Sequence, residues 1–409
     1  MKQNLALFAL CCLLLAACNP VSIPVALSTP VLTSPPTLIA IPTQRDSKCI
    51  SPLTTFVYPN GETTLLPSPQ EPVLPPADWA MISKVKYNHP ASLSLEVIQS
   101  HNGYDELWIL SNNNQGVFRY RTDTQEWRIT PSTTPNAPFA FGSFLFLDNS
   151  RSVWAARRWP KTLSITGDFS LLVYYNEASD QFEPVTDKDG LLQDSDSLAI
   201  EALEVSQNGI FWMIIKELDS INFKEIYYLY SFDPIALKAE RHLTGPQFSS
   251  NIVISPNGDI FMLDLSRGKL IEFHPSSGET KEYGIPDPEL SNQFSATIFL
   301  DSKSRLWVND IGWFDFSSAD LSPQWFTVIR SPVFIDVIEG AGVWSWGYPV
   351  FTYESSDALL WFWSSRGTGW LDTQYGEWCL FTTYRSPVLE DSSGRLWMLA
   401  DDTLYMKNR

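Results

Sequence analysis

Short hydrophobic runs alternate with polar turns along most of the chain after residue 76. Typical runs are "FGSFLFLD", "LLVYYN", "YYLYSFD" and "KLIEFHP", and the turns between them are rich in Asp, Asn, Ser and Gly. Short apolar or alternating segments bounded by such turns are typical of antiparallel strands joined by tight hairpins. The pattern therefore predicts an all-β fold built from many short strands.

One segment recurs through this region: a polar turn followed by an apolar pair that ends in an aromatic residue. Its clearest copies, "DSKSRLW" and "DSSGRLW", end at Trp307 and Trp397. Trp108 and Trp397 are 289 positions apart, so six intervals average about 48 residues, within the usual range of propeller blades. Seven copies align on the aromatic residues Trp108, Trp154, Trp212, Phe261, Trp307, Trp361 and Trp397.

Each copy has similar neighbours in the sequence. A short apolar strand comes before it, and two further strands follow, the last often opening with an aromatic residue as in "EWRIT" and "QWFTV". Four strands per unit describe a propeller blade. Because a single sheet cannot bury both faces alone, the repeated aromatic residue is expected to wedge between adjacent blades. The sequence thus predicts a seven-bladed β-propeller.

The last unit contains only three strands before the chain ends. The segment "ADWAMISKV", residues 77–85, has the pattern of a fourth strand and follows directly after a Pro-rich stretch. We expect this N-terminal strand to complete the C-terminal blade and remove a free sheet edge. The predicted propeller domain is residues 77–409.

The first residues have the features of an export signal. Lys2 precedes an apolar run from Leu5 to Ala17, which is too short to span a bilayer as a helix and suits a signal-peptide core. The run ends in "LAAC", which resembles the lipobox of bacterial lipoproteins. That resemblance implies a signal peptide over residues 1–17, cleavage after Ala17, and lipidation of Cys18. An ordinary signal peptide with a chance cysteine is the alternative.

Residues 18–76 are rich in proline, serine and threonine, a composition that favours extended backbone and predicts a stalk. Cys11 and Cys12 lie in the predicted signal peptide, which leaves Cys49 and Cys379 as the remaining cysteines beside Cys18. In an exported chain these two residues either form a disulfide or stay separate thiols, and the sequence leaves both alternatives open.

The D-x-x-G-x-L-W core, seen best in "EDSSGRLWMLADDTLYMKN", resembles the repeat of two-component-regulator propellers. Those propellers form sensor domains outside bacterial cells. The resemblance covers residues 77–409 and implies an extracytoplasmic β-propeller with a sensory role. This chain departs from the hybrid histidine kinases because it shows no kinase segment, so a sensory output would need a partner.

A second resemblance is to streptogramin-lyase-like propellers, which also repeat G-x-L-W. It implies histidines on a channel face with a divalent cation. Of the four histidines, His101, His242 and His274 fall in turns or outer strands, and only His89 falls in a loop type that usually lines the binding face. A lyase-like enzyme is therefore kept as the alternative, and a binding module without catalytic residues is favoured.

The chain is acidic, with a formal net charge of -18. Such a surface repels phosphate backbones, so nucleic acid is not expected as a partner. Paired loop acids such as Asp187 and Asp189 are interpreted as solvated turn residues. A weak Ca²⁺ site is the alternative for them, and no other cofactor or metal is predicted.

Two long insertions provide candidate ligand-binding residues, because loops on a rigid scaffold often carry binding sites. One is locally basic and the other is rich in Gly and aromatic residues, which suits peptide or glycan ligands. Packing between blades is the alternative role. The candidates are Arg157, Arg158, Trp159, Trp344, Trp346 and Tyr348.

Together these features predict a lipid-anchored propeller in the bacterial cell envelope, outside the cytoplasm, that acts in ligand binding, sensing or protein assembly. Its expected partners are the membrane and an unidentified protein, peptide or glycan. The sequence leaves open the ligand, the choice between inner and outer membrane, and the oligomeric state.

Overall fold

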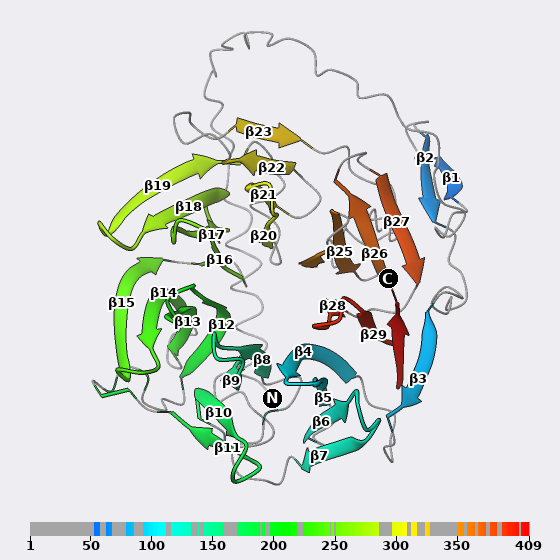
Figure 1. Ribbon diagram of the computed structural model, residues 1–409. Helices are drawn as coiled ribbons and strands as arrows, with labels where there is room; N and C mark the ends of the chain where they lie inside the picture. The colour runs from blue at the N-terminus through cyan, green and yellow to red at the C-terminus, as the bar shows by residue number, and fades with distance from the viewer. Residues whose placement is uncertain are drawn as a thin grey trace, which may run out of the picture. The chain divides into compact units, whose positions relative to one another are not determined.

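The chain folds into seven four-stranded antiparallel sheets arranged around a ring, as the computed structural model shows (Figure 1). All described residues belong to the compact unit formed by residues 44–409. The described ranges are 53–57, 63–67, 79–85, 93–111, 116–131, 143–158, 170–185, 197–219, 224–245, 251–285, 297–308, 312–316, 324–327, 350–355, 358–364, 367–373, 377–382, 387–400 and 402–408, with a few single positions between them.

Within each blade the strands follow one another from the inside of the ring to the outside, as the turns in the sequence predict. Blade one contains β4 (Leu93–His101), β5 (Tyr104–Ser111), β6 (Gly116–Arg121) and β7 (Trp127–Pro131). Blade two contains β8 (Ser143–Leu147), β9 (Val153–Arg157), β10 (Leu172–Asn176) and β11 (Gln181–Pro184). Blade three contains β12 (Leu198–Val205), β13 (Phe211–Asp219), β14 (Lys224–Asp233) and β15 (Lys238–Gly245).

The second half of the ring repeats this arrangement. Blade four contains β16 (Val253–Ile254), β17 (Ile260–Asp264), β18 (Lys269–His274) and β19 (Glu279–Gly284). Blade five contains β20 (Ile298–Leu300), β21 (Arg305–Val308), β22 (Gly312–Asp315) and β23 (Gln324–Thr327). Blade six contains β24 (Val350–Glu354), β25 (Leu359–Ser364), β26 (Gly367–Asp372) and β27 (Glu377–Thr382). Blade seven contains β28 (Val388–Glu390), β29 (Leu396–Ala400) and β30 (Thr403–Lys407) together with β3 (Ala80–Lys84).

Strand β3 closes the ring, which confirms the predicted role of the N-terminal strand. It pairs antiparallel with β30, and the Val85 amide donates a 2.7 Å hydrogen bond to the Asp402 carbonyl. Trp79, directly before β3, is buried against Trp361 of blade six in an edge-to-face contact with ring centroids 6.3 Å apart. The chain's first blade strand therefore ties the last two blades together.

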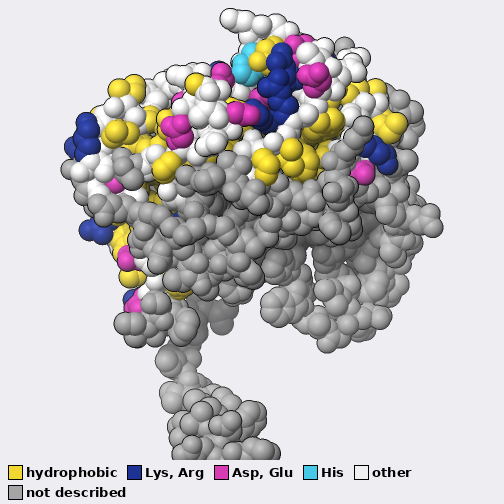
Figure 2. Space-filling view, turned by 90° about the horizontal axis from the view of Figure 1, so that it is seen from below, with side chains coloured by type: hydrophobic (Ala, Val, Ile, Leu, Met, Phe, Trp, Pro, Cys, Tyr) yellow, Lys and Arg dark blue, Asp and Glu magenta, His cyan; other side chains and the backbone are white. Residues whose placement is uncertain are grey.

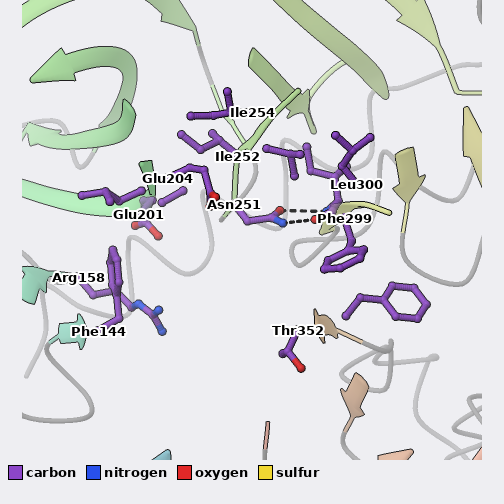
Figure 3. Close-up of a pocket in the computed structure, with 15 residues that line it drawn as sticks. Phe144, Arg158, Glu201, Glu204, Asn251, Ile252, Ile254, Phe299, Leu300 and Thr352 are labelled. Carbon is purple, nitrogen blue, oxygen red and sulfur yellow. Dashed lines mark hydrogen bonds between the residues drawn. The ribbon is translucent and has the colours of Figure 1, made fainter. Parts of the chain in front are cut away.

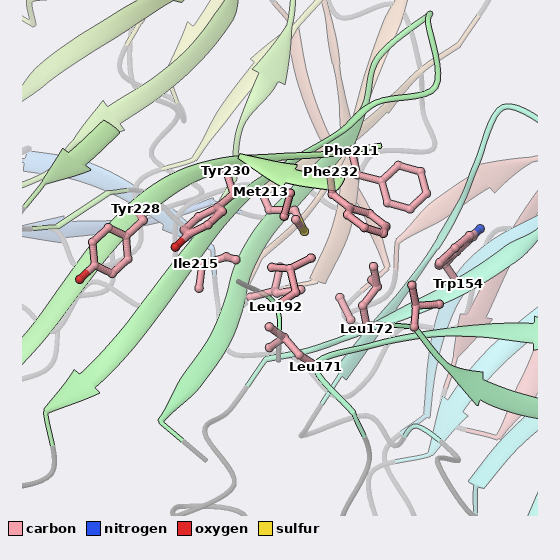
Figure 4. Close-up of a cluster of buried hydrophobic side chains, with 14 residues drawn as sticks. Trp154, Leu171, Leu172, Leu192, Phe211, Met213, Ile215, Tyr228, Tyr230 and Phe232 are labelled. Carbon is pink, nitrogen blue, oxygen red and sulfur yellow. The ribbon is translucent and has the colours of Figure 1, made fainter. Parts of the chain in front are cut away.

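The hydrophobic core consists of clusters between neighbouring blades, and each contains one repeated aromatic residue. Trp154 of blade two packs on Phe211 of blade three with centroids 5.0 Å apart, and Figure 4 shows both in one buried cluster. Trp397 of blade seven packs in the same way on the core of blade one, which includes Leu107 and Tyr120. The predicted wedge between blades is confirmed.

A buried carboxylate explains why the chain repeats D-S-x-x-R-L-W. The Asp301 carboxylate accepts hydrogen bonds from the amides of Lys303 (3.0 Å) and Arg305 (2.9 Å), the Arg305 Nε (2.6 Å) and the Trp307 indole (2.9 Å). This one side chain therefore shapes the turn and fixes the wedge. We call this arrangement the Asp corner; its members are Asp148, Asp301 and Asp391.

Part of the predicted stalk contains a strand pair. β1 (Leu53–Val57) and β2 (Thr63–Pro67) pair antiparallel, so this stretch is not simply extended. The remaining residues of the segment lie outside the described residues, and a stalk over residues 18–76 stays a prediction. Among the described residues there is no helix that has the length and apolar character needed to cross a membrane.

Candidate functional site

A cavity of about 460 Å³ lies among the inner strands of blades two to six (Figure 3). Inner strands face the centre of a propeller ring, so their side chains form the wall of its channel. Polar and apolar groups both contribute to that wall, so a small ligand could make both kinds of contact there. The described lining residues are Phe144, Arg158, Glu201, Ala202, Leu203, Glu204, Asn251, Ile252, Val253, Ile254, Ile298, Phe299, Leu300, Phe351 and Thr352.

An irregularity in β12 places two carboxylates on this wall. The register of β12 against β13 shifts between Ile200 and Ala202, which marks a β-bulge at Glu201. A bulge re-aims the side chains that follow it, and bulges are frequent beside functional sites. As a result Glu201 and Glu204, three positions apart, both line the cavity.

The charge of Glu201 is neutralised by Lys216 of the neighbouring strand β13. The Lys216 ammonium of β13 forms an ion pair with the Glu201 carboxylate and lies 3.5 Å from the Glu225 carboxylate. Lys216 is 8% exposed, and a buried cation needs such partners to offset its lost hydration. Glu201 is therefore already engaged by the protein.

Glu204 is the carboxylate available to a ligand. No hydrogen bond or ion pair joins it to another described residue, although its side chain is exposed to the cavity. The protein walls around it remove part of its hydration, and this desolvation raises its pKa to about 7. Water in the cavity still reaches the group, so Glu204 ionises near neutral pH and can accept hydrogen bonds from a bound cation.

Among the described lining residues the cationic group is Arg158, directly after β9 of blade two. Its guanidinium lies over the Phe144 ring, 5.1 Å from the centroid. The charge of Arg158 also acts on Glu96 of blade one, whose pKa is raised because burial outweighs the opposing effects of the Ser94 hydrogen bond and Arg158. Arg158 therefore lies near a buried carboxyl group, that of Glu96.

The amide of Asn251 has a structural role in the wall. It accepts a 3.0 Å hydrogen bond from the Ile298 amide and donates one to the Ile298 carbonyl, as the dashed lines in Figure 3 show. This pair of bonds joins the inner edges of blades four and five. These two bonds between a side chain and the backbone fix the spacing of blades four and five at the cavity wall.

The two adjacent arginines predicted as ligand-binding residues lie in different surroundings. Arg158 lines the cavity, whereas Arg157 is 2% exposed and donates a 3.0 Å hydrogen bond to the Leu198 carbonyl of blade three. Arg157 therefore joins two blades and is not part of the cavity wall. The other candidates lie outside the described residues: Trp159, Trp344, Trp346 and Tyr348.

Cys379 is the one cysteine among the described residues. This residue lies in β27, the outer strand of blade six as expected, and it is buried and disulfide-bonded. Cys18 and Cys49 lie outside the described residues, so lipidation and the Cys49–Cys379 pairing stay predictions. His89, the one histidine placed in a binding-face loop, also lies outside them.

The outer surface carries charges of both signs. Where residues are described in Figure 2, Lys and Arg side chains are interspersed with Asp and Glu and with hydrophobic groups. Asp187, one of the loop acids considered for calcium, is buried and accepts a 2.7 Å hydrogen bond from the Leu192 amide. Asp189 lies outside the described residues, and a calcium site there stays a prediction.

No protein-family model matches the chain, and no curated protein matches it. Among solved structures, a catalytically inactive variant of virginiamycin B lyase from Staphylococcus aureus, determined with quinupristin, has a TM-score of 0.53 at 12% identity, covering 80% of this chain and 98% of that chain. PorZ, a surface component of the type-IX secretion system of Porphyromonas gingivalis, has a TM-score of 0.50 at 13% identity, covering 86% of this chain and 55% of that chain.

A further match is the extracellular domain of the hybrid two-component system BT4673 from B. thetaiotaomicron, with a TM-score of 0.49 at 15% identity, covering 78% of this chain and 43% of that chain. At these identities the likeness shows the fold alone, and it confirms the seven-bladed propeller.

Proposed function

We propose that this chain is an exported, lipid-anchored propeller that binds a small ligand in its channel cavity, as a sensory or assembly module of the cell envelope. The observation that carries the proposal is the cavity, whose wall of polar and apolar groups includes one carboxylate, Glu204, with no protein partner among the described residues. The predicted export signal and the "LAAC" segment, which resembles a lipobox, support the location. PorZ, a bacterial surface component that shares the fold, agrees with it.

The charges of the wall indicate the chemistry of the ligand. Glu201 is paired with Lys216, and Arg158 has Glu96 nearby, which leaves Glu204 as the carboxylate in excess. A ligand that combines a protonated amine with an aromatic or apolar body would satisfy Glu204 and the surrounding phenylalanines. Amine-bearing peptides are one source of this chemistry.

The alternative is a lyase-like enzyme. One structural neighbour is a lyase variant that is catalytically inactive with alanine in place of a histidine. None of the described residues that line the cavity here is a histidine. The described part of the wall thus favours binding over this type of catalysis.

Saturation-transfer NMR on the full chain with two probes tests the proposal. Tryptamine carries an amine and an indole, and N-acetyltryptamine keeps the indole but is neutral. We expect tryptamine to bind about tenfold more tightly, because a hydrogen bond to a charged group contributes about 1.5–3 kcal/mol. Thr352→Trp, which fills the cavity, should remove binding, whereas Glu240→Gln on the exposed face of β15 should leave it unchanged.

The pH dependence assigns the carboxylate. Because the pKa of Glu204 is about 7, tryptamine affinity should rise as Glu204 ionises between about pH 6 and pH 8. Glu204→Gln should remove both this rise and the preference over N-acetyltryptamine. Binding that persists in Thr352→Trp, or the absence of binding by both probes, would contradict a ligand site in the channel.

A further inference from the structure

Blade four departs from the repeat at three positions, and their side chains lie together. Asp259 occupies the place that Arg305 and Arg395 hold in blades five and seven. Glu272 pairs in register with Phe261, the place that Trp313 holds opposite Trp307. Compared with blade five, each replacement puts an acid where that blade has a basic or an aromatic residue.

The third departure is His274, at the end of β18. In blade three the corresponding residue is Asp233, whose carboxylate accepts a 2.8 Å hydrogen bond from the Ile235 amide and so shapes the turn to the outer strand. The His274 ring instead points toward Asp259, and its Nδ1 lies 2.6 Å from the Asp259 Oδ1. A turn residue has thus become part of a side-chain cluster.

The geometry of this cluster calls for a positive charge. Ligand atoms of Asp259, Glu272 and His274 all lie within 4.8 Å of one another. With Nδ1–H donating to Asp259, the His274 Nε2 carries a lone pair; it is buried, has no hydrogen-bond partner among the described residues, and faces the Glu272 Oε2 at 3.9 Å. A lone pair opposite a carboxylate is unfavourable unless a cation or a proton lies between them.

We propose that the Asp259–Glu272–His274 cluster is a divalent transition-metal site. His274 Nε2 and Glu272 Oε2 are the direct ligands, and Asp259 orients the imidazole, as outer carboxylates do for metal-binding histidines. Two metal bonds of about 2.0–2.2 Å span at most about 4.2–4.4 Å, so the 3.9 Å separation leaves room for an ion, and a tetrahedral ion would draw the two atoms to about 3.4 Å. An imidazole with carboxylates suits Zn²⁺ and related ions.

The surroundings support this assignment. Glu272 is 7% exposed and accepts a hydrogen bond from the Tyr283 hydroxyl, which orients its carboxylate. The side chains of His274 and Asp259 are 18% and 25% exposed, so water can reach the cluster and complete the coordination. None of the three residues lines the channel cavity, so the metal site is separate from the proposed ligand site.

Calorimetric titration of Zn²⁺ into the full chain, purified without a polyhistidine tag and stripped with EDTA, tests the proposal. We expect one equivalent to bind, with affinity falling more than about 100-fold in His274→Gln and about 10- to 100-fold in Asp259→Asn. His101→Gln is the matched control, since that ring lies in blade one and stacks on Tyr104 with centroids 4.5 Å apart. Its affinity should equal that of the parent protein.

Histidine ¹⁵N NMR of the unsubstituted protein keeps the proposal testable if a variant fails to fold. Zn²⁺ should shift the Nε2 resonance of His274 and leave Nδ1 protonated. If both nitrogens are protonated at about pH 7 and Zn²⁺ changes neither, the cluster is an imidazolium held between two carboxylates, and the proposal is wrong. Equal Zn²⁺ affinity in His274→Gln would also overturn it.

Discussion

The turns before the second strands of blades two, five and seven differ from those of blades three, four and six at their first residue. The first group has the Asp corner, and the second has serine at the same place, Ser206, Ser255 and Ser355. Ser206 shows the smaller set of bonds: its hydroxyl accepts from the Ile210 amide at 3.1 Å and donates to the Ile210 carbonyl at 2.8 Å. The serine still bonds to the backbone of the turn, but it makes no hydrogen bond to the aromatic residue that wedges between the blades.

The difference shows what the carboxylate adds. At an Asp corner the indole N–H of the wedge is bonded to the turn, so Trp307, which packs on Phe351 of blade six, is held by its own hairpin. In blade four the wedge is Phe261, which has no N–H to satisfy, and Ser255 bonds only to backbone, through the Asp259 amide at 3.1 Å. Asp corners thus couple turn geometry to packing between blades.

Removing an Asp corner should have the largest effect. Asp301→Ala leaves buried N–H groups and the Arg305 guanidinium without their acceptor, and breaking a buried ion pair costs about 3–5 kcal/mol. Ser355→Ala is the matched change at a Ser corner, where losing a neutral hydrogen bond costs about 1 kcal/mol. Urea unfolding followed by tryptophan fluorescence measures both, and equal destabilisation by the two changes would break the comparison.

A double-mutant cycle sharpens the comparison by rebuilding a blade-four corner in blade five. Asp301→Ser and Trp307→Phe should each lower the free energy of unfolding. The double variant should lose about 1–3 kcal/mol less than the sum of the two single losses, because the removed indole donor and carboxylate acceptor bond to each other. Asp301→Ser combined with the distant Trp397→Phe is the control and should be additive within about 0.5 kcal/mol. Additivity of the adjacent pair would mean that the indole bond contributes nothing.

Features carried by the repeat could be predicted from the sequence. An aromatic residue at the place that Trp307 holds in the repeat marks the second strand of each blade. The number of blades, the aromatic wedge between them and the closing strand therefore follow from the sequence pattern alone. The hydrogen bond from Trp307 to Asp301 does not follow from the strand pattern, although the repeated spacing D-x-x-x-x-x-W contains its signal.

Features that depend on contacts between distant residues could not be predicted. The bulge at Glu201 re-aims Glu204 into the cavity, and no spacing in "LAIEALEV" marks it. Arg157 and Arg158 are neighbours in the chain, yet only the structure shows that one joins two blades and the other lines the cavity. The turn position of His274 follows from the repeat, but its contact with a residue of another hairpin depends on how the two hairpins pack.

The smallest expected effect concerns the residue three positions before each wedge. Six blades have a positive φ there, met by glycine at Gly394 (φ 80°) but by alanine at Ala358 (φ 63°). An L-residue in this region is strained by about 1–2 kcal/mol, which glycine avoids. Glycine in turn costs about 0.4–1 kcal/mol of folding free energy, because its unfolded chain has more conformational entropy to lose. The net effect of Ala358→Gly should therefore be a stabilisation of roughly 0.5 kcal/mol. Gly258→Ala is the reverse change, with no atom within 4 Å of the added Cβ, and should destabilise by a similar amount through strain alone. Thermal unfolding compares the two variants, and a loss of stability in Ala358→Gly would show that blade six tolerates the alanine without strain.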